Sequence, residues 1–99
     1  MKDRSHDEGM AELFREDPEF ATQYLNSVLE EGDQADLLVA LRQMAQALGG
    51  VPVVADKAHL NATQLYRTLS AEGNPELRSL TALLKAMGMR LAVEPIRQP

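Results

Sequence analysis

The stretch VPVVADKAHLNATQLYRTLS, residues 51–70, decides the fold of this chain. Its first part places apolar residues at helical spacing, and Pro52 suits the first turn of a helix, where the missing N–H leaves no hydrogen bond unmade. Asn61 is placed to start a second helix as an N-cap, and Gln64, three residues later, completes a capping-box pattern. The stretch therefore predicts two short helices joined by a tight turn, the pattern of a helix-turn-helix.

Two core-type residues and one turn residue complete this pattern. Ala55 is small where the first helix must pass close to the second, and Leu65, ten residues later, is placed to fill the angle between them. His59 stands in the turn, where glycine is common because the turn residue often needs a positive φ, which histidine tolerates less well. An ordinary helical hairpin in a small bundle is the alternative explanation of the same stretch.

Length and composition indicate one small, helical domain. The chain has 99 residues, no Trp and four aromatic residues in all, so its apolar volume comes mainly from Leu, Ala, Val and Met. A chain of this size buries only a small core, which favours a dimer or a partner. The absence of Cys excludes disulfides and thiolate metal sites. No run of about 18 apolar residues and no signal peptide is present, so a cytoplasmic protein without membrane association is expected.

Charge is distributed unevenly between the two halves of the chain. Residues 1–49 carry four basic and eleven acidic residues, a net charge of −7, whereas residues 50–99 carry six basic and four acidic residues, a net charge of +2. A phosphate backbone would prefer the second half, and a basic protein partner would prefer the first. The alternative is that the acidic helices are simply soluble surfaces.

Helix start and stop signals divide the first half. Residues 1–9 are charged and are expected to form a disordered tail, followed by a turn or two of helix. Asp17 and Pro18 predict a helix start, since Pro is favoured at the first helical position. Gly32 is expected to close that helix in a left-handed conformation, and Asp33 to cap the next one.

The second half ends with one more helix and an extended segment. Gly73 is expected to take a positive φ, and Asn74 and Pro75 to start a helix that Gly88 ends. Residues 89–94 then alternate apolar and polar side chains, which is the pattern of a short β-strand. One strand needs a second edge for its backbone hydrogen bonds, so that edge must come from another molecule or from a weakly signalled segment.

Motifs for enzymatic chemistry do not occur in the sequence. It has no phosphate-binding glycine loop, dinucleotide fingerprint, nucleophile elbow or zinc-protease motif. His6 and His59 fall in the expected tail and in a turn, which disfavours a metal pair. The protein is therefore expected not to be an enzyme and to need neither a metal nor another cofactor.

Three segments narrow the choice of family: YLNSVLEEGD (24–33), LNATQLYRTLSAEGNPELRSL (60–80) and LLKAMGMRLAVEP (83–95). They resemble the small antidote (antitoxin) proteins of bacterial addiction modules, in the HigA-like class with a Cro/repressor-type (Xre-like) helix-turn-helix. The chain departs from that family at His59, where glycine is favoured. It departs again at residues 51–53, where the family usually carries polar residues that can touch phosphate.

The resemblance implies a fold and a set of partners. The fold is all-α, with five to six helices in one Cro/repressor-type helix-turn-helix domain over residues 10–99 and a short C-terminal β-strand at 89–94. The protein would neutralise a small basic RelE-like toxin, often an mRNA-cleaving ribonuclease. It would also repress its own operon by binding operator DNA, as a homodimer or in complex with the toxin.

The second helix of the 51–70 stretch carries the candidate DNA-binding residues. Arg67 is the first candidate for base readout, because a guanidinium can bridge two acceptors on guanine; a solvated surface arginine is the alternative. Base edges are usually reached from the first turn of such a helix, although Asn61 and Gln64 also fit a capping role there. The full candidate set is Asn61, Ala62, Thr63, Gln64, Tyr66 and Arg67, with Lys57 as a candidate phosphate contact.

For the toxin, the sequence indicates only surfaces. The acidic residues Glu30, Glu31, Asp33 and Asp36 are candidates to face a basic partner, although their place at a helix end also fits capping and solvent exposure. The segment 89–94 is suited to pair with a sheet of the toxin or with its own copy in a homodimer. Two alternatives to a DNA-binding antitoxin stay open: a stand-alone or phage-derived transcriptional regulator without a toxin, and a protein-interaction module that has lost DNA binding.

Overall fold

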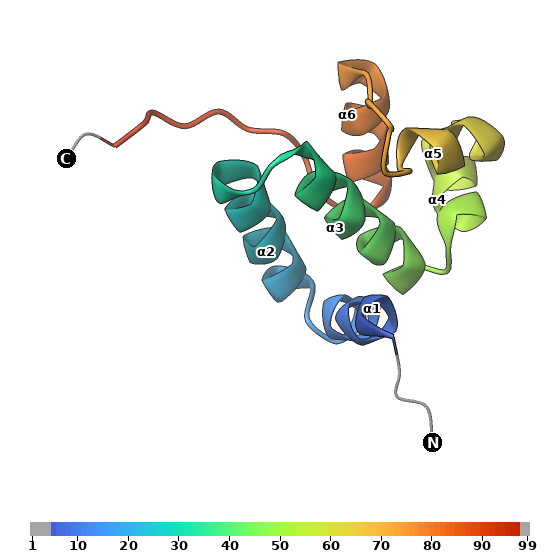
Figure 1. Ribbon diagram of the computed structural model, residues 1–99, viewed down its shortest axis with the longest axis horizontal. Helices are drawn as coiled ribbons and strands as arrows, with labels where there is room; N and C mark the ends of the chain where they lie inside the picture. The colour runs from blue at the N-terminus through green and yellow to red at the C-terminus, as the bar shows by residue number, and fades with distance from the viewer. Residues whose placement is uncertain (1–4, 98–99) are drawn as a thin grey trace.

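The computed structural model describes residues 5–97, in which six α-helices form (Figure 1). In chain order they are α1 (His6–Glu16), α2 (Pro18–Glu31), α3 (Gln34–Ala47), α4 (Val51–Ala58), α5 (Ala62–Thr68) and α6 (Leu77–Ala86). No β-strand forms within residues 5–97, so the expectation of an all-α fold with five to six helices agrees with the structure.

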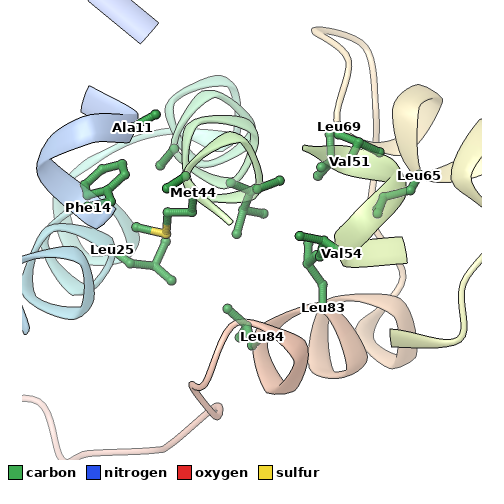
Figure 2. Packing of buried hydrophobic residues seen from close by; sticks show 14 of the residues in the cluster. Ala11, Phe14, Leu25, Met44, Val51, Val54, Leu65, Leu69, Leu83 and Leu84 are labelled. Atoms are coloured by element: carbon green, nitrogen blue, oxygen red, sulfur yellow. The ribbon is translucent and has the colours of Figure 1, made fainter. Parts of the chain in front are cut away.

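Helix α3 lies at the centre of the arrangement. It packs against α1, α2 and α4, and α4 in turn packs against α5 and α6 (Figure 1). Figure 2 shows the buried side chains in two groups. The first group, next to α1 and α2, contains Ala11, Phe14, Leu25 and Met44, and the second contains Val51, Val54, Leu65, Leu69, Leu83 and Leu84. Both groups belong to one continuous core, which joins the acidic half of the chain to the other half.

Helix α1 begins earlier than the sequence predicted. Ser5 is its N-cap, so residues 6–9 are helical and do not belong to the expected tail. The remainder of that tail, residues 1–4, lies outside the described residues. The Gln43 side chain of α3 donates a hydrogen bond to Asp7 Oδ1 at 2.9 Å. This contact stabilises the first turn of α1, and local sequence signals do not reveal it because its partners are 36 positions apart.

The caps of α2 and α3 follow the predicted chemistry, but Gly32 does not. Asp17 caps α2, and Asp33 caps α3 in a capping box: Asp33 Oδ1 accepts from the Asp36 N–H at 2.9 Å, and Asp36 Oδ2 accepts from the Asp33 N–H at 3.1 Å. The prediction of a left-handed Gly32 is wrong, because its φ of −89° and ψ of 172° are extended. A Cβ there would lie 2.8 Å from the Val28 carbonyl oxygen, so close approach explains this glycine.

The connection between α5 and α6 also differs from the prediction. Helix α6 starts at Leu77 with Glu76 as N-cap, later than Pro75 indicated. Gly73 does not take the expected positive φ. A Cβ at Gly73 would lie 1.7 Å from the carbonyl oxygen of Thr68, the last residue of α5, so the end of that helix leaves no room for a side chain at Gly73.

The C-terminal segment after α6 is extended but is not a strand. Gly88, with a φ of 83°, ends the α6 region as predicted, and the chain then continues to residue 97 without helix or strand (Figure 1). The Met89 N–H donates to the Leu84 carbonyl oxygen at 2.8 Å, and beyond it no backbone hydrogen bond ties this segment to the rest of the described chain. The strand expected over 89–94 is therefore not formed in the single chain, because no second edge lies beside it.

No single helix within residues 5–97 is long and apolar enough to cross a membrane. The pair of α3 and α4 reaches the required length and apolar content only when the two are taken together, and the pair is bent by 91° at its break.

Candidate nucleic-acid interface

Helices α4 and α5 are two short helices joined by a tight turn, as the sequence predicted. His59 follows α4 in the left-handed conformation, at φ 59° and ψ 40°. Asn61 starts α5 as its N-cap, with Oδ1 accepting a hydrogen bond from the Gln64 N–H at 2.9 Å. His59 thus adopts the backbone geometry that favours glycine, and histidine is one of the residues that tolerate it.

Buried side chains fix α5 against α4 and the core. Ala55 is 1% exposed and Leu65 is 3% exposed, so both side chains are buried in helices that pack against each other. Leu69 is fully buried at the end of α5, and its carbonyl oxygen accepts a hydrogen bond from the Arg42 guanidinium of α3. The opposite face of α5 is therefore presented to solvent from a well-packed support.

One side of α5 carries most of the predicted readout residues. Gln64 and Arg67 are exposed and line a groove that also contains Glu76 and Ser79, near the start of α6. Thr63 is exposed next to Gln64 in the first turn of α5. In the described part of the chain, the Gln64 and Arg67 side chains have no hydrogen-bond or ion-pair partner. Their polar groups are thus available to a bound molecule.

Three other predicted residues are placed differently. Asn61 lines the same groove but serves as the cap, and the Gln64 side chain does not return to the Asn61 N–H, so the predicted capping box is only half formed. Ala62 is half-buried and packs against the core, which leaves only part of its methyl group accessible. Lys57 is exposed on α4 and does not line the groove.

Tyr66 lies apart from Gln64 and Arg67. It is 56% exposed and lines a hollow with Arg42 and Gln46 of α3 and with Gly50, directly before α4. Sequence analysis missed Arg42 and Gln46 as candidate ligand contacts. Their spacing of four residues, just before the glycines that precede α4, places them on one face of α3 and is the signal that could have found them.

The four acidic residues considered for a protein partner do not form one cluster. Asp33 and Asp36 hold each other's backbone N–H groups in the capping box, although both are exposed. Glu31 and Asp36 line a hollow beside α2 and α3, whereas Glu30 lines a different groove, between α2 and the C-terminal segment. Among the described residues, no group of three or more His, Asp or Glu side chains is placed to hold a metal ion.

Comparison with known proteins identifies the family. A family model described as "Probable addiction module antidote protein" matches residues 6–95, nearly the whole chain. The chain therefore belongs to the addiction module antidote family, whose members act as antitoxins, and its partner in general terms is a toxin. A relative from Haemophilus influenzae, described as an uncharacterized protein, is 31% identical over 74 residues, which cover 75% of this chain and 75% of that protein. No solved structure matches the chain significantly.

Proposed function

We propose that this protein is a DNA-binding antitoxin that neutralises a small basic RelE-like toxin and represses its own operon. The observation that carries the DNA-binding part is the exposed face of α5. Gln64 and Arg67 project there without a partner in the described chain, while Leu65 and Leu69 anchor the helix from behind. In this proposal α4 and α5 form a helix-turn-helix of the Cro/repressor type, Xre-like and HigA-like, with α5 in the major groove.

Base readout is assigned to residues 62–67 of α5, with Arg67 in the last turn of the helix. The Arg67 guanidinium can bridge O6 and N7 of guanine, and the Gln64 amide can pair with the corresponding edge of adenine; each bidentate pair is worth about 1–3 kcal/mol of discrimination. Gln64 is free for this because it does not close the capping box. Thr63 can bond to either base type, and Ala62 offers its accessible methyl surface to a thymine methyl.

Contacts to the phosphate backbone fall to the residues around this helix. Lys57 is exposed on α4, and Tyr66 shares its hollow with Arg42 and Gln46. These positions can fix the orientation of the protein without reading sequence. Lys57 and Tyr66 belong to the half of the chain with a net charge of +2, which a phosphate backbone attracts, whereas Arg42 and Gln46 belong to the half with a net charge of −7.

The toxin contact falls to the acidic half in this proposal. Residues 1–49 carry a net charge of −7, and Glu30 and Glu31 are exposed at the end of α2, so a basic toxin is attracted to this side. Such a role calls for binding and for no catalysis. Because operator DNA is the ligand, the protein acts in the cytoplasm, and a homodimer presents two α5 helices to the half-sites of a palindromic operator.

A protein-interaction module without DNA binding is the second candidate, and one observation favours it. Pro52 and Val53 occupy the first turn of α4 and are exposed, Val53 at 51%. An apolar pair there supplies no hydrogen bond to a phosphate. The net charge of −5 also opposes binding to nucleic acid. In this case the α5 face contacts the toxin.

One titration separates the two candidates. The purified chain is titrated against a duplex from upstream of its own reading frame and against a scrambled duplex, at two salt concentrations. Arg67→Ala is the test variant, and Arg97→Ala, which removes the same charge far along the C-terminal segment, is the matched control. We expect the chain to bind the native duplex selectively and more weakly as salt increases. Arg67→Ala should lower the affinity for the native duplex about 5- to 150-fold, and Arg97→Ala should leave that affinity unchanged.

The opposite results are equally informative. Equal weakening by Arg67→Ala and Arg97→Ala would reduce Arg67 to a general electrostatic contribution. The titration is repeated with the co-expressed neighbouring gene product, because a chain that binds DNA only together with its toxin would not bind in the first titration. If neither the chain nor that complex binds the duplex at low salt, the DNA-binding proposal fails and the interaction module is supported.

A further inference from the structure

The C-terminal segment is the part of the described chain whose backbone the fold leaves most open. Beyond Met89 it makes no backbone hydrogen bond to the rest of the described chain, and it exposes large apolar side chains: Leu91 at 36%, Val93 at 99% and Ile96 at 85%. It runs past α2 (Figure 1). Together with Leu29 of α2, it lines one groove. An extended, apolar and unpaired segment is a template for pairing with another strand.

The order of side chains in this segment selects one kind of partner. Arg90 lies two residues before Ala92, and Glu94 lies two residues after it. The segment is therefore charge-complementary to itself when it is turned through a two-fold axis at Ala92. In that antiparallel register, Arg90 faces Glu94 of the second copy on both sides of the axis, and Leu91 faces Val93 of the second copy on the other surface of the ribbon.

Other arrangements of residues 89–95 do not have this property. Parallel pairing in register places Arg90 against its own copy and Glu94 against its own copy, which is repulsive. An antiparallel slip by two residues removes both charge pairs, and a slip by one residue turns the apolar side chains to the opposite surface. Pro95 has no N–H to donate, so it ends the ladder at the point where the complementary residues end.

We propose that two copies of this chain associate through antiparallel pairing of residues 90–94 about a two-fold axis at Ala92. The apolar surface of the ribbon then covers the groove beside α2, where Leu29 is 48% exposed and Leu25, Leu84 and Met89 supply the apolar lining. This support matters because two short strands alone are only marginally stable in water. This inference rests on the homodimer of the proposed function and assigns its interface; a monomeric wild type removes that homodimer, whereas the contact of α5 with DNA is tested separately by the Arg67→Ala titration.

A charge-reversal series tests the register. The full-length wild-type chain, Arg90→Glu, Glu94→Arg and the double variant R90E/E94R are compared by sedimentation equilibrium without DNA or toxin. Each single variant converts two opposite-charge pairs into two like-charge pairs, whereas the double variant restores both pairs with their direction reversed. Arg97→Glu, the same change beyond Pro95, is the matched control. Circular dichroism verifies that all variants retain their helices.

We expect the wild type, the double variant and Arg97→Glu to dimerise alike, and each single variant to raise the dimer dissociation constant at least about tenfold. An equimolar mixture of the two single variants should recover the wild-type constant, because their segments are complementary to each other. A monomeric wild type, or no recovery in the double variant and the mixture, overturns the proposal. If the monomeric wild type then binds its toxin and loses that binding when residues 89–97 are removed, the segment pairs with a strand of the toxin and not with a second copy of this chain.

Discussion

The acidic half, α1 to α3, and the half containing α4 to α6 use their polar side chains differently. In the acidic half, many charged groups are bound within the fold: Asp17 and Asp33 cap helices, and Arg15 Nε donates to the Ala47 carbonyl oxygen at 3.0 Å. On the exposed face of α5, Gln64 and Arg67 have no partner in the described chain. Charge in the first half therefore contributes to stability, and the polar groups of α5 are left for a ligand.

The largest expected effect breaks both halves at once. Leu41 is fully buried in α3, which packs against α1 and α2 of its own half and against α4 of the other half. Leu41→Ala should therefore lower the free energy of unfolding by about 2–5 kcal/mol. Leu77→Ala, at a 70% exposed position of α6, is the control and should change it by less than about 0.5 kcal/mol. Urea denaturation followed by circular dichroism measures both. Two separate transitions in the Leu41 variant would show that the halves do not share one core.

The next effect concerns the glycines. Gly73→Ala places a Cβ where the Thr68 carbonyl oxygen already lies, so the loop must move, and the loss of stability should be about 1–3 kcal/mol or more. Gly9→Ala has open space and lies within α1, where alanine should stabilise by about 0.5–1 kcal/mol. Thermal unfolding of the two variants should shift in opposite directions. A shift in the same direction would show that the Gly73 loop yields easily.

A smaller effect separates capping acids from free acids. Asp33→Ala removes the acceptor for the Asp36 N–H and should cost about 0.5–2 kcal/mol of stability, whereas Asp33→Asn should retain most of it because asparagine also caps. Glu31→Ala should leave stability nearly unchanged. Denaturation measures the stability of each variant, and a toxin-binding titration measures its affinity for the toxin. If Asp33→Ala and Glu31→Ala proved equally harmless to stability, the capping box would be energetically unimportant.

The smallest effect lies in the turn between α4 and α5. His59→Gly relieves a side chain held at a positive φ and should raise stability by up to about 1 kcal/mol. The DNA affinity of a protein that binds through α5 should not change, since His59 is not among the groove residues. A His59→Gly variant that loses DNA affinity while it gains stability would make the imidazole a ligand contact.

Local chemistry was sufficient to predict the helix starts at Asp17, Asp33 and Asn61, because a cap depends on residues within one turn. It was insufficient for Gly32 and Gly73. At both positions a carbonyl oxygen of the preceding helix leaves no room for a Cβ, and neither glycine is required by a positive φ. The N-terminal limit of α1 was missed for a related reason, since part of its support comes from across the fold.

In the candidate site, too, local features could be predicted from the sequence, whereas features that depend on packing between distant segments could not. Helical periodicity was enough to place Thr63, Gln64 and Arg67 toward solvent, because Leu65 had to face the core. It did not place Arg42 and Gln46 in the same hollow as Tyr66, since that arrangement depends on how α4, which packs against both α3 and α5, positions the two helices. The strand over 89–94 was predicted from alternation alone, and alternation does not supply the second edge that a strand requires.

Helix α3 also holds the chain on both sides of the segment that follows α5. Arg42 binds the Leu69 carbonyl oxygen, and Gln34, eight positions earlier on α3, donates to the Gly73 carbonyl oxygen at 2.8 Å. Helix α5 has seven residues and cannot persist without such support. Its amide protons should therefore exchange with solvent mainly when α3 itself undocks, so the free energy of opening α5 approaches that of unfolding the whole domain.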